Sequence, residues 1–145
     1  MTYKEKKIDW IIHFCANHAC DICGEEETHF LPYTCNAHTH GMEKYGHPDF
    51  QVVLLLPTQE IAYLLNIMGI RVQEGEVFHP GDLVSDIYAD CEIRLDEYEE
   101  MGRNVLRLII PDRENRFPEH PHCMDIYKLQ LLPTKALCME GGEIS

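Results

Sequence analysis

Two short motifs between residues 20 and 38 have the residue types and spacing of a metal site. The first is Cys20-x-x-Cys23-Gly, and Cys35-x-x-His38 follows after eleven intervening residues. A CxxCG turn directs two thiolates toward one ion, while the glycine permits the tight backbone. A second pair completes a tetrahedral site, and the spacing is typical of a zinc ribbon. The sequence therefore predicts structural Zn²⁺ at Cys20, Cys23, Cys35 and His38; alternatively, the cysteines are simply buried thiols.

Strand geometry raises an objection to this site and suggests another. If the second motif lies in one continuous strand, Cys35 is on one face, and His38 and His40 are on the other. Cys35 and His38 could then share an ion only if a bulge or turn near Asn36 interrupted the alternation. The alternative ligand set is His38, His40 and His47, an open three-histidine site of the kind that activates water. A redox CxxC is disfavoured because a glycine and three acidic residues follow it.

His47 lies in the turn-like sequence Gly46-His47-Pro48-Asp49. A histidine next to proline usually caps a loop or hydrogen-bonds to its backbone. Histidine is also the side chain that most often acts as a general base, which makes His47 the candidate catalytic residue. The two serines of the chain lie outside any G-x-S-x-G elbow, which disfavours a serine hydrolase. Whether the chain is an enzyme stays open.

Two arginines follow the apolar segment that ends at Pro111. Arg113 and Arg116 lie in the sequence PDRENRFP, beside Asp112. In an acidic protein such a pair could clamp a carboxylate or phosphate group. Alternatively, the arginines pair with acidic residues of the same loop, Asp112 among them, and hold the loop together. We favour this second interpretation.

The candidate residues must be positioned by helical and extended segments. Apolar periodicity predicts helices at residues 3–17, 58–75 and 96–102. It predicts strands at residues 30–40, 50–56, 83–95, 105–110 and 126–132, with a loose tail after residue 133. Strands grouped between two helices favour the α+β class. We therefore expect a largely antiparallel sheet packed with an N-terminal and a central helix, in one compact domain spanning 1–145.

The composition disfavours several classes of protein. The chain has 145 residues and a formal net charge of -13, which disfavours binding to nucleic acids and to anionic membranes. The N-terminus has no signal-peptide cleavage pattern, and no apolar run is long enough to cross a bilayer. A cytoplasmic location is expected. In that reducing compartment the seven cysteines should be thiols or metal ligands.

Four blocks of the chain carry a family resemblance. In order, they are FLPYTCNAHTHGMEKYGHPDFQVVLLLP, a helix carrying LLN, GEVFHPGD and VLRLIIPDRENRFP. They resemble the bacterial family known as domain of unknown function 4262 and cover most of residues 28–133. The resemblance implies a small stand-alone cytosolic bacterial protein but no activity. It places any shared function on His47 and on Arg113 and Arg116, because the Cys20–Cys23 pair and the His38–His40 doublet look like additions of a subgroup.

These observations lead to three expectations for function. The favoured one is a small module that binds a ligand or a protein partner and carries a candidate structural zinc. The alternative is a metal-assisted or anion-binding enzyme that uses a pocket of His38, His40 and His47 with Arg113 and Arg116. The third is a homodimeric interaction protein joined through a strand edge or an apolar helix face.

Overall fold

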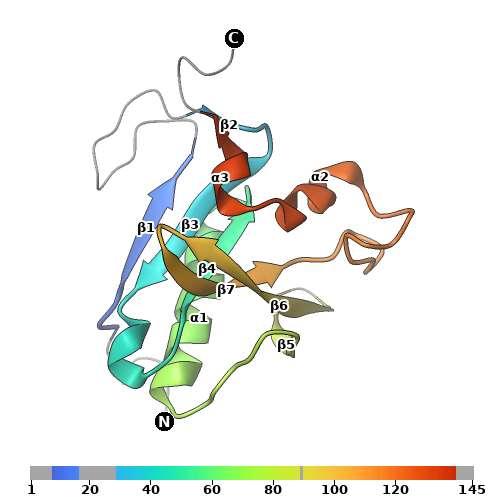
Figure 1. Cartoon of the computed structure of the whole chain (residues 1–145). Helices are drawn as coiled ribbons and strands as arrows, with labels where there is room; N and C mark the ends of the chain where they lie inside the picture. The colour runs from blue at the N-terminus through green and yellow to red at the C-terminus, as the bar shows by residue number, and fades with distance from the viewer. Residues whose placement is uncertain (1–7, 17–28, 89, 140–145) are drawn as a thin grey trace.

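The computed structural model describes residues 8–16, 29–88 and 90–139. Its centre is a six-stranded sheet in the order β1-β3-β4-β7-β6-β5 (Figure 1). In chain order these strands are β1 (Ile11–Cys15), β3 (Thr34–His40), β4 (Asp49–Leu54), β5 (Leu83–Tyr88), β6 (Cys91–Glu100) and β7 (Arg103–Ile109). Two short strands, β2 (His29–Phe30) and β8 (Cys138–Met139), pair with each other.

Helices cover both faces of the sheet (Figure 1). One face is covered by α1 (Thr58–Gln73). The other is covered by three short C-terminal helices, α2 (Asp125–Lys128), η3 (Leu129–Leu131) and α3 (Thr134–Leu137), while η2 (Met42–Tyr45) connects β3 to β4. Strand alternation divides neighbouring residues between the two sides. Val52 belongs to the core under α1, whereas Val53 packs with Leu137 of α3.

The pairing of the strands confirms the α+β class. Four of the five pairings in the described sheet are antiparallel, and β4 with β7 is parallel. The chain passes from β4 to β7 through α1, β5 and β6. In the described part of the chain, none of the helices has the length and apolar character that crossing a membrane requires.

The N-terminal helix predicted at residues 3–17 is wrong in the part that the structure describes. The segment Ile11–Cys15 is β1, an edge strand paired with β3. Ile12 and Phe14 pack against the core under α1, while His13 points to the opposite side. The apolar residues fit a period of two as well as a helical period, and pairing with β3 decides between them. Residues 3–7 and 17 lie outside the described residues.

The short helix predicted at residues 96–102 is also wrong. β6 continues to Glu100 and pairs with β7, and Glu100 lies opposite Arg103. The turn between the strands is Met101-Gly102, in which both residues have positive φ, 54° and 82°. Two successive positive φ angles suit the twist of a tight hairpin. This hairpin holds Glu100 and Arg103 side by side.

The C-terminal segment is helical rather than extended. Residues 126–132 were predicted as a strand, but residues 126–131 lie in α2 and η3. The segment after residue 133, predicted to be loose, contains α3 and β8. Gln130 holds this segment against the sheet, because its amide accepts from the Ile110 N–H at 2.8 Å and donates to the Ile110 carbonyl at 2.7 Å. A side-chain amide that replaces a neighbouring strand leaves no signal in hydrophobic periodicity. The central helix and the strands predicted at residues 50–56 and 105–110 are confirmed, and residues 83–95 contain β5 and the first half of β6. The strand predicted at residues 30–40 is divided into β2 and β3.

Trp10 joins the start of β1 to α1. It is 5% exposed, and its indole N–H donates to Asn66 Oδ1 at 2.9 Å. Its ring lies against Gly69, where an added Cβ would stand 2.6 Å from the ring carbon Cζ2. The glycine inside α1 therefore permits a close approach of the indole and does not end the helix.

Gly69→Ala is expected to destabilise the protein by about 1–3 kcal/mol, because overpacking the Trp10 contact outweighs the helix propensity of alanine. Chemical denaturation of the variant measures the change. In the double variant with Trp10→Leu the alanine should cost much less, since the ring is gone. An increase in stability for Gly69→Ala alone would contradict this account of the contact.

Candidate metal centre

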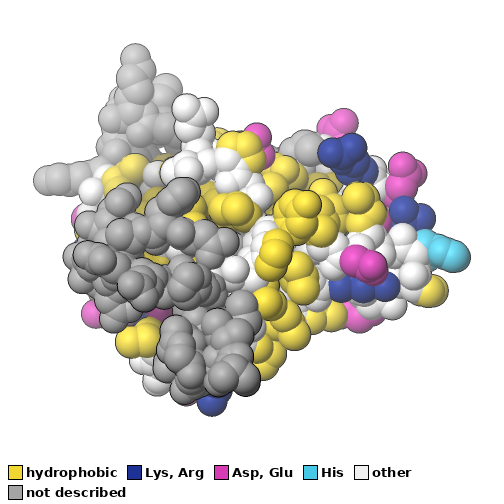
Figure 2. All heavy atoms as spheres, turned by 90° about the horizontal axis from the view of Figure 1, so that it is seen from above, with side chains coloured by type: hydrophobic (Ala, Val, Ile, Leu, Met, Phe, Trp, Pro, Cys, Tyr) yellow, Lys and Arg dark blue, Asp and Glu magenta, His cyan; other side chains and the backbone are white. Residues whose placement is uncertain are grey.

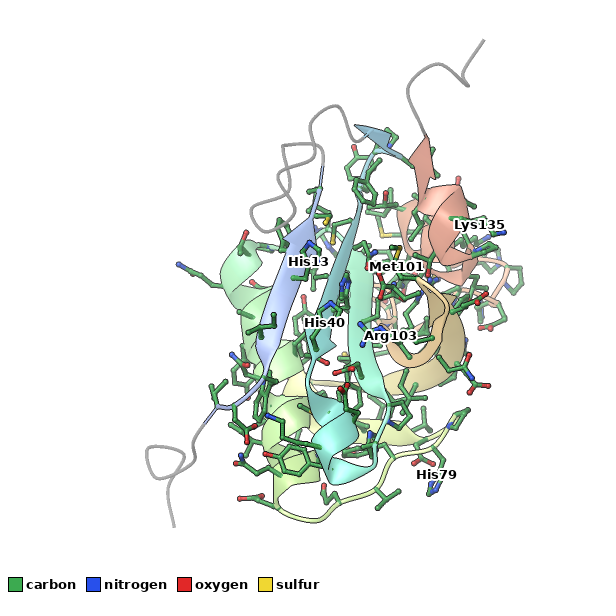
Figure 3. The ribbon with its side chains drawn as sticks, turned by 60° about the vertical axis from the view of Figure 1, so that its left-hand side comes forward. His13, His40, His79, Met101, Arg103 and Lys135 are labelled. Atoms are coloured by element: carbon green, nitrogen blue, oxygen red, sulfur yellow. The ribbon has the colours of Figure 1, made fainter. Side chains whose placement is uncertain are left out.

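Three histidines converge on the sheet face opposite α1. His13 of β1 lies directly opposite His38 of β3, and His40 is two residues further along β3, so strand alternation places all three on one face. One ligand nitrogen of each lies within 4.8 Å of the other two. The His38 ring centroid is 4.9 Å from that of His13 and 4.8 Å from that of His40. Figure 3 shows His13 and His40 on the adjacent strands. Binding of one Zn²⁺ ion by all three would require each nitrogen to lie about 2.0–2.1 Å from the ion.

The cluster is buried at one end and open at the other. His38 is 2% exposed, while His13 and His40 are partly exposed, so an ion can reach the cluster past the outer two rings. Burial lowers the pKa of His38 to about 3, helped by the neighbouring charges of His40 and His13. Burial also lowers the pKa of His40. His38 and His40 are therefore neutral near pH 7, which is the form of imidazole that binds metal ions.

A chain of hydrogen bonds determines which nitrogen of His38 carries the proton. Arg107 Nε can only donate, and it donates to Gln51 Oε1 at 2.7 Å. The Gln51 amide nitrogen therefore donates to Asn36 Oδ1 at 3.0 Å. Because Asn36 Oδ1 can only accept, His38 Nδ1, which lies 3.0 Å from it, carries the proton. The lone pair of His38 is left on Nε2. We call Arg107, Gln51 and Asn36 the amide chain.

Glu100 faces this lone pair. Its Oε2 lies 3.6 Å from His38 Nε2 and accepts from Asn36 Nδ2 at 3.4 Å, while its Oε1 accepts from Arg103 Nε at 3.1 Å. Glu100 is 2% exposed. With the proton of His38 on Nδ1, two acceptors face each other at the buried end of the cluster. A cation beside them would offset the resulting repulsion.

Cys15 places a sulfur atom next to the cluster. Its Sγ lies 3.4 Å from His13 Nε2, and the side chain is partly buried. A thiolate is a good ligand for zinc and for softer ions. The Sγ of Cys15 is not among the ligand atoms that lie within 4.8 Å of one another, so Cys15 becomes a fourth ligand only if its side chain moves, and that movement decides whether the fourth coordination site is closed by protein or open to water.

Comparisons of the chain with protein-family models, with curated proteins and with solved structures find no match. The resemblance to domain of unknown function 4262 therefore stays a prediction.

The predicted three-cysteine, one-histidine zinc site does not form from Cys35 and His38. A register shift does interrupt the pairing of β3 with β4 between Thr34 and Ala37, close to Asn36. Nevertheless Cys35 lies in the core under α1, where its thiol contacts the Val52 and Leu54 carbonyls at 3.7 and 3.8 Å. Burial raises the pKa of Cys35 to about 12, which disfavours the thiolate that a metal requires. Cys20 and Cys23 lie outside the described residues.

The alternative ligand set was His38, His40 and His47. His38 and His40 lie together in the cluster, but His47 is not part of it. The His47 ring donates from Nδ1 to the Pro48 carbonyl and accepts from the Phe78 N–H at Nε2, both at 2.9 Å. It also packs on Phe50, whose side chain belongs to the core under α1. His47 therefore joins two loops, and its place in the cluster is taken by His13. Both ring nitrogens are engaged with backbone, which disfavours a role as general base.

The arginine loop is held by its own acidic residue, but only for Arg116, whereas the favoured interpretation predicted that both arginines pair with acidic residues of the loop. Asp112 is buried and accepts from the Arg116 guanidinium at 3.1 Å. It also accepts from the backbone N–H groups of Glu114, Arg116 and Met124. Burial by itself raises the pKa of Asp112, but these donors outweigh burial and lower the pKa to about 2. Arg113 is exposed and makes no ion pair with the described residues.

Several residues of the centre were missed from the sequence. His13 lay in the segment predicted as a helix, although the alternation of His13 with Cys15 was available as a signal. The others act across strands that are distant in sequence, and no local pattern identifies them: Gln51, Glu100 and Arg107.

Proposed function

We propose that this protein binds one divalent transition-metal ion, in the first instance Zn²⁺, through His13, His38 and His40. The observation that carries the proposal is the convergence of three ligand nitrogens within 4.8 Å. It is supported by the amide chain, which holds the proton of His38 on Nδ1 and so leaves the lone pair on Nε2. Metal-binding histidines usually have their second nitrogen held in this way.

The ligand chemistry narrows the choice of ion. Three imidazoles suit Zn²⁺, Cu²⁺ and Ni²⁺, whereas Mg²⁺ and Ca²⁺ prefer oxygen ligands. Three protein ligands leave a fourth tetrahedral position for water or for a further side chain. Cys15 is the candidate for that position, since its sulfur lies beside His13.

Titration of the metal-free protein with Zn²⁺ is expected to reach one equivalent. His38→Ala should weaken binding by more than about 100-fold, because a ligand contributes more than the outer partners, whose loss costs about 10- to 100-fold. Competition with a chelating dye measures the affinity. His79→Ala is the matched control, because His79 is exposed and lies apart from the cluster (Figure 3). Unchanged affinity in variants of all three cluster histidines would sink the proposal.

A second candidate function, metal-assisted hydrolysis, is favoured by the position of Glu100. Zn²⁺ held by three histidines lowers the pKa of a coordinated water. The Glu100 carboxylate lies 3.6 Å from His38 Nε2 and could accept the proton of that water. Cleavage of 4-nitrophenyl acetate by the zinc-loaded protein, and its loss in Glu100→Gln, would support this function. A rate no higher than that of free Zn²⁺ would count against it.

Cys15 distinguishes a structural from a catalytic centre. If its thiolate completes the coordination, the Co²⁺-loaded protein has a sulfur-to-cobalt absorption band, and Cys15→Ser removes the band. If the band is absent from the wild-type protein, the fourth position is open, as hydrolysis requires.

A further inference from the structure

The connections of the two parallel strands diverge to opposite faces of the sheet. β4 and β7 are neighbours and run parallel. From the end of β4 the chain enters α1 on one face, whereas from the end of β7 it leads to α2 and η3 on the other (Figure 1). In open α/β sheets, such a divergence leaves a crevice outside the carboxyl ends of the two strands, where ligands bind. This α+β sheet has the same divergence at its one described parallel pair, which makes the ends of β4 and β7 the place to look for a ligand site.

A cavity lies at this point. It has a volume of about 550 Å³, within the range of small-molecule sites. Leu56 and Pro57, which follow β4, and Pro111, which follows β7, line it together with Tyr88 and Tyr127. Part of its wall is therefore apolar and aromatic. Figure 2, which views the molecule from the end toward which β4 points, shows hydrophobic side chains across the middle of the surface and charged side chains gathered to one side.

The cavity also presents charges of both signs. Arg113, in the loop after β7, is its cation and makes no ion pair with the described residues. Asp112 lines it too, but Asp112 is neutralised by Arg116 and by backbone donors. The acidic groups that stay available are Glu60 in the first turn of α1 and Asp90 in the β5–β6 turn.

Tyr88 orients one of these acidic groups. Its hydroxyl donates to Glu60 Oε1 at 3.3 Å, which leaves the second oxygen of Glu60 available. Burial, with the neighbouring charge of Glu60, raises the pKa of Tyr88 to about 12, so the hydroxyl keeps its proton. The carboxylate is accordingly held on the α1 side, while Arg113 comes from the loop after β7.

We propose that this cavity binds a small zwitterion, a molecule with one ammonium group, one carboxylate group and an apolar body. Glu60 and Asp90 receive the ammonium group, Arg113 receives the carboxylate, and the prolines and tyrosines pack on the apolar body. Amino acids and their ω-amino relatives belong to this class. A simple anion is disfavoured, because two uncompensated carboxylates outnumber the single arginine. The site is separate from the histidine cluster and does not depend on the metal proposal.

Chemical-shift mapping with ¹⁵N-labelled protein tests the proposal with matched probes. L-phenylalanine and 6-aminohexanoate are zwitterions with short and long spacing between their charges. Phenethylamine and 3-phenylpropionate each keep one charge of phenylalanine. At least one zwitterion should shift the amides around Arg113 and Tyr88. If phenylalanine is the zwitterion that binds, its two single-charge analogues should bind at least about 10-fold more weakly than phenylalanine does.

Two surface variants separate the contributions of the charges. Arg113→Gln should weaken binding of the zwitterion and of 3-phenylpropionate by about 10-fold and leave binding of phenethylamine unchanged. Glu60→Gln should weaken binding of phenethylamine by about 10-fold and leave binding of 3-phenylpropionate unchanged. Arg71→Gln, at the other end of α1, is the control and should change nothing. The proposal is overturned if neither zwitterion, added at about 10 mM, shifts these amides. Such a result would mean that the dissociation constant is well above the millimolar range. It is also overturned if both variants bind like the wild type.

Discussion

Gln51→Glu is expected to move the ring proton of His38 from Nδ1 to Nε2 and to weaken Zn²⁺ binding by about 10- to 100-fold. A carboxylate at this position still accepts from Arg107 Nε but cannot donate to Asn36. The Asn36 amide is then expected to turn, so that its nitrogen donates to the new carboxylate and to His38 Nδ1. The turn removes the Asn36 donor from Glu100, and the proton of His38 moves to Nε2, where it replaces that donor beside the carboxylate 3.6 Å away.

The expected consequence for the metal centre is specific. A protonated Nε2 has no lone pair for an ion, and binding requires the proton to move or to leave. The fold should tolerate the change, because the new carboxylate lies beside the buried guanidinium of Arg107. Among the described residues, that guanidinium has no carboxylate within hydrogen-bond distance. A loss of affinity without a loss of stability therefore distinguishes positioning from unfolding.

Long-range ¹H–¹⁵N correlation spectra of the imidazole rings report the tautomer of His38 directly. The metal-free wild type should have Nδ1 protonated, and Gln51→Glu should have Nε2 protonated. Gln51→Met is the control, because it removes the donor without placing a carboxylate there, and its affinity should lie between the other two. If Gln51→Glu keeps the wild-type tautomer, the amide chain does not control His38, whatever the metal affinity is. If the tautomer switches and zinc affinity is unchanged, His38 Nε2 is not a ligand.

Arg107→Met is expected to destabilise the fold by at least about 3 kcal/mol, because several buried acceptors lose their donor at about 1–3 kcal/mol each. Arg107 is 0% exposed, and burial lowers its pKa to about 10, so it is still charged at neutral pH. It donates to Gln51 and also to the carbonyls of Gln130 and Leu132 at 2.7 and 2.5 Å. Its guanidinium stacks 3.5 Å from the centroid of the Tyr98 ring.

Arg107 thus joins the central strand β7 to the C-terminal helices and to the metal centre at once. Thermal denaturation of Arg107→Met should show a fall in Tm of roughly 10 °C, given the size of the chain. Arg71→Met, near the end of α1, is the matched control and should change stability by less than about 0.5 kcal/mol. A comparably small effect for Arg107→Met would mean that its buried acceptors find other partners. The Tm of Arg107→Lys should lie between that of the wild type and that of Arg107→Met, because lysine keeps the charge and loses the planar guanidinium fork.

Local sequence determined much of the sheet and part of the site. The strands around residues 49–54 and 103–109 contain apolar runs, and the helix of residues 58–73 has apolar residues at helical spacing; these signals are local. Strand alternation alone placed His38 and His40 on one face and Cys35 on the other. Alternation therefore predicted that Cys35 and His38 would not share one zinc ion.

Tertiary structure decided what completes the cluster. His13 becomes the third histidine because β1 pairs with β3 in a register that sets it opposite His38, and register depends on contacts between segments distant in sequence. The same holds for Glu100 and Arg107, which reach His38 and Gln51 from strands more than 50 residues away. The cavity beside Arg113 likewise exists only because β4 and β7 lie side by side and their connections diverge. The sequence shows which residue types are present. Strand pairing determines which of these side chains lie close together in the fold.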